Sequence, residues 1–280
     1  MALKKQHFAE GQKNLMTKNN DYIKHLSESW ASCGVNTGDI LLVHSNIKRT
    51  LVKARRKGVQ LTPDDILDSF LDCLGNSGTL LLPLFNFDFP TKKVFDIRNT
   101  PSQMGALTEV ARMRSDVVRT GHPIYSFAVL GKEKDKFEGL INESGYGENS
   151  PFGLLHKLDG KIASLDLEDQ NSMTFYHYVE ESMMVNYRHF KTFSGTYYDS
   201  IGHESRRDFK LFVRDIKRNV LTHVNPAGEL LWRNGLYSGD RPKENSGLRT
   251  LKANEMFGFV SHLIDAGNAE GNLFVYGEEK

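Results

Sequence analysis

The sequence predicts a mixed α/β fold, and three observations lead to that prediction. Up to about residue 181, helix-like segments alternate with short apolar runs that are typical of buried strands. At residues 161–181 an apolar run ends at a segment of acidic and turn-forming residues, and a helical pattern follows directly. Residues 189–232 instead contain strand-like runs separated by turns, so we expect the second half of the chain to be more antiparallel.

The composition predicts one continuous globular body. The chain has 280 residues, of which 39% are hydrophobic and 25% are charged, and it contains no linker-like or low-complexity tract. This length is enough to bury a sizeable core, so we expect a single domain over residues 1–280. Because 36 Lys and Arg balance 35 Asp and Glu, the chain as a whole has no positive field that would recruit nucleic acid.

Neither a metal site nor a membrane segment is expected. Cys33 and Cys73 lie far apart, without the spacing of metal ligands, and no zinc-binding helix motif occurs. No run approaches 18 apolar residues, and residues 1–20 lack the apolar core of a signal peptide. We therefore expect a cytoplasmic protein.

The order of the elements follows from apolar periodicity and from the residues that end each run. Helices are expected at residues 18–33, 63–74, 103–114 and 253–266, and strands at 40–43, 79–84, 124–130, 192–198, 209–216 and 273–276. Thr62 suits the cap of the second of these helices and Pro63 its first position. Ser150 and Pro151 have the same arrangement, and the helix that they begin could receive an anion at its N-terminus.

The stretch at residues 161–181 also contains the strongest candidate for a catalytic base. A helix is expected to start near Met173, with Asn171 or Ser172 as its cap. One face of this helix would present Thr174, His177 and Glu180 or Glu181, which recur at steps of three and four residues. A helix N-terminus disfavours imidazolium, so the histidine would stay neutral and could accept a proton near pH 7. The alternative is a histidine packed among its aromatic neighbours.

A basic run follows the first expected strand, and we expect it to form a loop. Its six cations are Lys48, Arg49, Lys53, Arg55, Arg56 and Lys57. The run is either a solvated surface loop or a phosphate anchor beside Ser45, and the absence of interleaved aromatic residues argues against nucleic acid. Residues 85–101 are expected to form an aromatic loop, which would be a core flap or a substrate wall.

Six blocks taken together resemble the aminoglycoside 3-N-acetyltransferase family. In chain order they cover residues 43–45, 78–83, 104–109, 119–128, 147–152 and 174–180, the last with the pattern Thr174-x-x-His177-x-x-Glu180. The resemblance implies a three-layer α/β/α enzyme with a mixed central sheet. Such an enzyme transfers an acyl group from acyl-coenzyme A to the amino group of an amino sugar, and it uses no metal.

The resemblance also implies roles for individual residues. His177 falls on the catalytic histidine of the family, and Glu180 matches the motif position beside it. The residues expected to contact acyl-coenzyme A are His44, Ser45, Asn46, Ile47, Lys48, Arg49, His122, Ser126, Phe127, Ala128, Ser150, Phe152 and Thr174. At the acceptor we expect Phe85, Phe87, Asp88 and Glu181.

Two departures from the family pattern bear on the acceptor. Resistance enzymes usually have a glycine where this chain has Asp166 and a second serine where it has Asn46. Basic residues beside the expected site would suit the diphosphate of a nucleotide-linked amino sugar of surface-polysaccharide biosynthesis, which we expect as the acceptor. The alternatives are an aminoglycoside antibiotic, or a non-catalytic coenzyme A-binding protein of the same fold. The expected partner is thus a small molecule, and the sequence leaves a homo-oligomer open.

Overall fold

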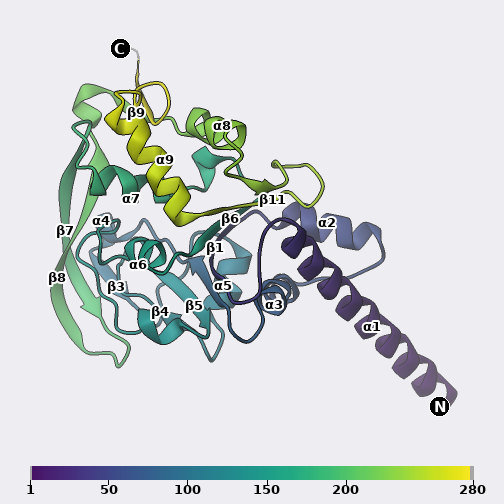
Figure 1. Ribbon diagram of the computed structural model, residues 1–280. Coiled ribbons are helices and arrows are strands. Elements are labelled where there is room, and N and C mark those ends of the chain that lie inside the picture. The colour runs from purple at the N-terminus through teal and green to yellow at the C-terminus, as the bar shows by residue number, and fades with distance from the viewer. Residues whose placement is uncertain (1, 278–280) are drawn as a thin grey trace.

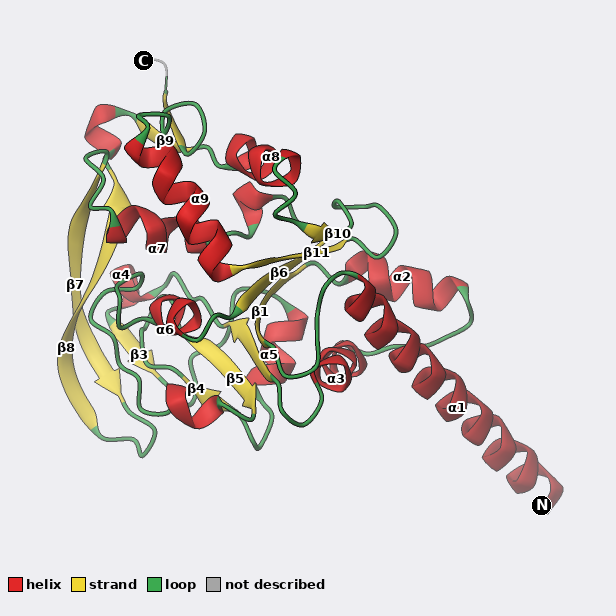
Figure 2. Ribbon diagram, viewed as in Figure 1, coloured by secondary structure: helices red, strands yellow, loops and turns green. Residues whose placement is uncertain are grey.

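A mixed sheet forms the centre of the computed structural model, which describes the backbone of residues 2–277 and the side chains of residues 17–277. Within this range seven strands pair in the order β10-β11-β6-β1-β2-β5-β4 (Figures 1 and 2). The parallel strands are β6 (Lys161–Leu165), β1 (Ile40–Ser45) and β2 (Thr79–Pro83). Antiparallel pairs add β11 (Leu248–Lys252), β10 (Ser238–Gly239), β5 (Phe127–Gly131) and β4 (Val118–Arg119). The first and last residues of the expected domain, 1 and 278–280, lie outside the described part.

Helices cover both faces of the sheet, which confirms the expected three-layer architecture. One layer contains α1 (Ala2–Ser32), α3 (Pro63–Leu74) and α5 (Ala106–Arg112), and the other contains α6 (Pro151–Lys157), α7 (Phe175–Ser182) and α9 (Ala253–Asp265). Because side chains alternate along a strand, Leu41 and Val43 of β1 pack with the first layer, whereas Leu42 packs with the second. None of the helices in the described part is long and apolar enough to cross a bilayer.

The second half of the chain is more antiparallel, as expected. The hairpin of β7 (Arg188–Tyr198) and β8 (Glu204–Arg214) runs along one edge of the molecule in Figure 2, with β3 (Val94–Asp96) beside β7. A separate pair joins β9 (Val220–Thr222) to β12 (Phe274–Tyr276). The remaining elements are α4 (Phe89–Lys92), η1 (Lys134–Phe137), η2 (Asp169–Asn171), η3 (Ile216–Arg218) and α8 (Asn225–Arg233).

Several segments differ from the sequence prediction. The basic run is not a loop but α2 (Lys48–Arg56), because Thr50 and Ala54, four residues apart, give the helix a narrow buried stripe of small side chains. Part of the expected aromatic loop forms α4 and β3, and the region expected to contain only strands and turns includes α8. The prediction also missed β11, whose five residues alternate too little to be recognised as a strand.

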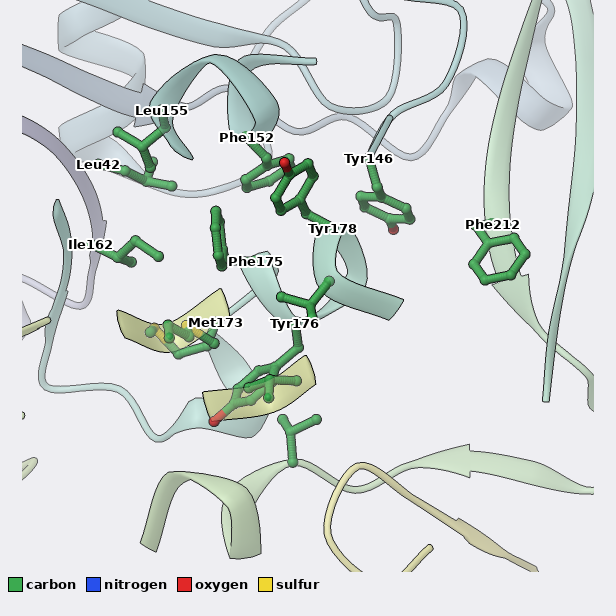
Figure 3. Packing of buried hydrophobic residues seen from close by; sticks show 14 of the residues in the cluster. Leu42, Tyr146, Phe152, Leu155, Ile162, Met173, Phe175, Tyr176, Tyr178 and Phe212 are labelled. Atoms are coloured by element: carbon green, nitrogen blue, oxygen red, sulfur yellow. The ribbon is translucent and has the colours of Figure 1, made fainter. Parts of the chain in front are cut away.

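Aromatic side chains fill the layer between the sheet and α7. Figure 3 shows Phe152, Phe175 and Tyr178 close to Leu42 and Ile162 of the central strands. Phe175 and Tyr178 lie with their ring centroids 5.0 Å apart, and both are almost fully buried. Because these side chains fix the first turn of α7 against the sheet, they also fix the direction of the side chains on its opposite face.

The C-terminal end of α1 packs into the second hydrophobic cluster, on the opposite face of the sheet. Trp30 stacks on Phe70 of α3 with ring centroids 4.9 Å apart and an interplanar angle of 4°. Its indole N–H donates to Ser69 Oγ at 2.8 Å, so the polar atom of this buried ring is satisfied.

We predict that Trp30→Ala lowers the free energy of unfolding by about 3–5 kcal/mol, because it leaves a cavity where a stacked ring packs. Ser69→Ala is the matched control. It leaves the ring packing intact but removes both hydrogen bonds of the Ser69 hydroxyl and leaves the buried indole N–H without its partner, so it should cost about 1–3 kcal/mol. Both values can be measured by chemical denaturation, and a loss below about 1 kcal/mol for Trp30→Ala would show that α1 does not unfold with the core.

Candidate active site

The candidate site lies at the carboxyl ends of β1 and β6, where the chain leaves β6 and enters α7. The cap of α7 is Thr174, without a side-chain hydrogen bond, so the expected capping by Asn171 or Ser172 is wrong. Ser172 instead shapes the turn before the helix: its hydroxyl accepts from Ser164 Oγ at 3.0 Å and donates to the Glu168 carbonyl at 2.8 Å. The first turn of α7 therefore starts at the edge of the sheet where open α/β proteins bind ligands.

His177 in this turn contacts a buried ion pair. Its Nδ1 lies 2.7 Å from Glu180 Oε2 and 2.8 Å from an NH2 nitrogen of Arg188. Arg188 Nε lies 2.8 Å from the same Glu180 oxygen, and its other terminal nitrogen donates to the Phe212 carbonyl at 2.6 Å. The His177 side chain is 19% exposed and that of Glu180 only 1%. Of these two side chains, the imidazole is therefore the one that reaches solvent.

This arrangement allows two tautomers of His177, with different consequences. Nδ1 either donates its proton to the Glu180 carboxylate or accepts a hydrogen bond from Arg188, but it cannot do both. Only the first tautomer leaves Nε2 with a free lone pair. A carboxylate at Nδ1 favours this tautomer, since it can accept but cannot donate.

The surroundings keep His177 neutral and Glu180 charged. Burial and then the positive charge of Arg188 lower the pKa of His177, against the opposing effect of Glu180. Burial alone would raise the pKa of Glu180, but the charge of Arg188 and the hydrogen bond from His177 outweigh it, so the pKa is lowered. At neutral pH the site therefore combines an uncharged imidazole with a carboxylate whose charge Arg188 compensates.

Three cavities meet in front of α7. The α7 cavity, of about 230 Å³, is lined by His177, Thr174, Phe87 and Tyr125 among others. The β1 cavity, of about 640 Å³, extends from His44 along residues 45–48 to residues 103–108. The acidic cavity, of about 530 Å³, lies between residues 166–171 and residues 225–249. Asn171 lines all three cavities, so the two larger cavities adjoin the one that contains His177.

The acidic cavity carries more negative than positive charge. Its lining includes five carboxylates but only three cations. Three of the acids are engaged in ion pairs, namely Asp166 with Arg49, Asp169 with Arg249 and Glu229 with Arg241. Two others, Glu168 and Glu244, have no ion pair within the described residues and are exposed. The described residues include no group of His, Cys, Asp and Glu side chains that could hold a metal ion.

A second buried ion pair forms the wall between the α7 cavity and the acidic cavity. Asp169 accepts from Arg249 at 2.7 Å and from the hydroxyls of Tyr176 and Tyr237 at 2.8 Å and 2.7 Å. The strand register places Arg249 beside Ser164. Sequence reasoning missed both Arg249 and Arg188. The only signal was an arginine within a short apolar run, which does not identify its partner.

The structure brings together about half of the residues expected at acyl-coenzyme A. His44, Ser45, Asn46, Ile47 and Lys48 line the β1 cavity, and Thr174 lines the α7 cavity. His44 lines both cavities. Burial and then the charge of Arg249 lower its pKa to about 3, so it is neutral at physiological pH. Arg49 points away from the β1 cavity and makes a bidentate contact with Asp166, with both distances 2.7 Å.

The other residues expected at the coenzyme line none of these cavities, and the structure places them in the interior. These are His122, Ser126, Phe127, Ala128, Ser150 and Phe152, all fully buried. His122 Nδ1 accepts from the backbone N–H groups of Ile124 and Tyr125, so it shapes a turn. Ser150 caps α6 as expected, but that helix terminus is buried and offers no room for an anion.

Two of the four residues expected at the acceptor lie at the site. Phe85 and Phe87 line the α7 cavity, although only Phe87, which is 50% exposed, offers a free ring face. Asp88 lies outside the cavities and pairs with Lys92 at 2.8 Å. Glu181 also points elsewhere and accepts from Ser144 Oγ at 2.8 Å.

The basic run does not converge on the site. Lys48 alone of its six cations lines the β1 cavity, and Arg49 is paired with Asp166. Lys53, Arg56 and Lys57 face a different cavity, between α1 and α2. The charge argument for a nucleotide-linked acceptor, which relied on cations beside the active-site strand, therefore finds no support in the geometry.

Comparison with known proteins identifies the family of the chain. A family model described as aminoglycoside 3-N-acetyltransferase matches residues 42–265. One curated relative is the SPbeta prophage-derived aminoglycoside N(3')-acetyltransferase-like protein YokD of Bacillus subtilis (strain 168), which is 25% identical over 181 residues. That match covers 55% of this chain and 63% of the relative, so the chain spans less than two thirds of the length of YokD.

Solved structures with a similar fold are aminoglycoside acetyltransferases. AAC(3)-Xa has a TM-score of 0.71 and 21% identity, over 92% of this chain and 98% of its own. AAC-IIIb, in a binary complex with CoASH, has a TM-score of 0.69 and 20% identity, over 91% and 97%. AAC-VIa bound to sisomicin has a TM-score of 0.69 and 18% identity, over 88% and 98%. At these identities the likeness concerns the fold.

We predict that His177 titrates below the ordinary histidine range and that Arg188→Met raises its pKa. The substitution removes the neighbouring positive charge that lowers the pKa of His177, and this favours imidazolium. NMR of the imidazole carbon and nitrogen shifts across pH 4 to 9 measures this directly.

Glu180→Gln is the matched variant with the opposite sign. It removes the charge that favours imidazolium, so the pKa of His177 should fall further. If both variants shifted the titration in the same direction, the charges of Glu180 and Arg188 would not be its cause.

Proposed function

Since the chain belongs to the aminoglycoside 3-N-acetyltransferase family, we propose that it transfers an acetyl group from acetyl-coenzyme A to an amino group of a cationic amino sugar. The observation that carries this proposal is the position of His177. Its imidazole is held by Glu180 and lines a small cavity that shares lining residues with both the β1 cavity and the acidic cavity. An acyl donor and an amine acceptor could approach it from two sides.

The β1 cavity is the proposed site of the coenzyme. Apolar side chains such as Leu51, Val52 and Met104 line it, which suits a narrow pantetheine arm, and Lys48 offers a charge for a phosphate. Its volume of about 640 Å³ lies in the range typical of small-molecule sites. The complex of the structurally similar AAC-IIIb with CoASH supports this choice of co-substrate.

The proposed reaction is direct aminolysis of a thioester. His177 Nε2 takes a proton from the attacking amine while the new C–N bond forms, the C–S bond then breaks, and the thiolate leaves and is protonated. Only a neutral amine can attack, so a positioned base contributes roughly 10²- to 10⁴-fold to the rate. Glu180 would keep the proton of the imidazole on Nδ1 and stabilise the imidazolium that forms.

The acidic cavity is the proposed acceptor site. Its excess of carboxylates, and in particular the unpaired Glu168 and Glu244, supports an acceptor that carries several ammonium groups. A nucleotide-linked sugar would bring a diphosphate to the same surface, where these charges would repel it. An aminoglycoside-like acceptor therefore fits the site better than the nucleotide-linked amino sugar expected from the sequence.

We also propose that residues 1–280 act as one domain, because β10 and β11, near the end of the chain, belong to the same sheet as β1, near its start. A cytoplasmic location, where acetyl-coenzyme A is made, would supply the co-substrate.

The first prediction for this reaction is that His177→Gln lowers kcat by about 10²- to 10⁴-fold and leaves the dissociation constant of coenzyme A unchanged. Glutamine fills a similar volume but cannot accept the proton. Thiol release with acetyl-coenzyme A and an aminoglycoside measures turnover.

His262→Gln is the control, because His262 is an exposed histidine on α9, outside the four cavities described in this structure. It should behave as the unsubstituted protein. Turnover close to that of the unsubstituted protein in a correctly folded His177→Gln variant would rule out His177 as the base.

The second prediction concerns the acceptor. Glu168→Gln combined with Glu244→Gln should lower kcat/KM for a polycationic aminoglycoside about threefold to tenfold, since exposed charge pairs are typically worth 0.2–1 kcal/mol each. The loss should shrink as salt screens the charges.

The control is Glu255→Gln on α9, which removes one negative charge outside the acidic cavity and should change kcat/KM little. If the double variant instead improved the use of an anionic nucleotide-linked amino sugar, and the unsubstituted protein acetylated no aminoglycoside, the cationic acceptor would be wrong.

A further inference from the structure

A fourth cavity, which we call the basic cavity, lies between α1 and α2. It measures about 520 Å³, and it shares no lining residue with the three cavities around His177. The two sides of α2 face different spaces. Lys48, Leu51 and Val52 line the β1 cavity, whereas Lys53, Arg56 and Lys57 line the basic cavity. The basic cavity is therefore separate from the proposed acetyltransferase site.

The lining of the basic cavity is positive and uncompensated. It includes three cations and His25 but no carboxylate, although the chain as a whole has a formal charge of only +1. Lys53 donates to the Asn245 carbonyl. Arg56 and Lys57 form no ion pair with any side chain of residues 17–277. Burial and then the charge of Arg49 lower the pKa of Lys53, against the opposing charges of Asp166 and Asp240, which do not line the cavity. An anion would supply the missing negative charge.

The floor of the basic cavity is apolar and aromatic. Leu26 and Trp30 are buried there, and the ring of Tyr22 is partly exposed beside them. Lys57 Nζ lies 5.4 Å from the centroid of the Tyr22 ring. Cations next to an aromatic face suit a ligand that joins phosphate groups to a flat ring. The volume also lies in the range of sites for small organic ligands.

We propose that the basic cavity binds a nucleoside phosphate, with its phosphates at Lys53, Arg56 and Lys57 and its base against Tyr22 and Leu26. The same chemistry occurs in a free nucleotide and in the ADP portion of coenzyme A. The separation of the basic cavity from the β1 cavity by α2 assigns it to the free nucleotide.

Calorimetric titration of the full chain with ADP tests this assignment. ADP should bind equally well without coenzyme A and with saturating coenzyme A. Adenosine and inorganic pyrophosphate should each bind at least about tenfold more weakly, because each lacks one half of the recognised groups. Competition between ADP and coenzyme A would overturn the proposal, since the cavity would then belong to the coenzyme. Pyrophosphate binding as tight as that of ADP would overturn the role of Tyr22 and Leu26.

The chain offers a matched control for the charges. Arg56→Ala should weaken ADP about tenfold, because a hydrogen bond to a charged group is lost. Arg55→Ala removes the same charge from the same helix, but Arg55 does not line the cavity, so it should change ADP binding less than about twofold. Both residues are exposed, so neither change should disturb folding, which circular dichroism checks. Equal effects of the two variants, or no ADP binding by the unsubstituted protein at millimolar concentration, would overturn the proposal.

Discussion

The buried ion pair between Glu180 and Arg188 is the interaction on which the chemistry of the site depends. It joins α7 to the first residue of β7 and so fixes the hairpin relative to the helix that carries His177. A carboxylate at this depth would take up a proton without its partner, and a protonated Glu180 would no longer be a pure acceptor for the imidazole. Such a pair contributes little net stability, but it selects one arrangement of charges, and with it one useful tautomer of His177.

A second constraint acts on the segment between β6 and α7. Asp166 has a φ of 54°, a left-handed conformation that favours glycine, and its carboxylate is held by Arg49. The contact with Arg49 thus holds a side chain at a backbone position that glycine adopts more readily. Asp169 is held in the same way by Arg249. Because both acids are held in ion pairs, the proposed recognition of a cationic acceptor relies on Glu168 and Glu244.

The six cations of the basic run show how tertiary structure distributes a charge cluster. As a helix, the run points its side chains in several directions, so that Lys48 lies at the β1 cavity and Arg49 at Asp166, while Lys53, Arg56 and Lys57 share the basic cavity. The sequence left both a solvated surface loop and a phosphate anchor open for this run. Proximity in sequence could not show which of them act together, because neighbours on a helix diverge by about 100°.

The sequence by itself determined the alternation of elements and the placement of His177 and Glu180 on one face of a helix, because periodicity and three-residue spacing are local properties. The three-layer class came from the family resemblance, and the contact between His177 and Glu180 came from the structure. It also identified the strand end at residues 44–48 that lines the β1 cavity. Only the tertiary structure decided that Arg188 and Arg249 complete the site, since each depends on the register of a strand that pairs with a distant segment. Likewise, the sequence could not show that His122 and Phe152 are fully buried. Residue type does not decide which side chains a ligand can reach, because this depends on what packs against them in the folded chain.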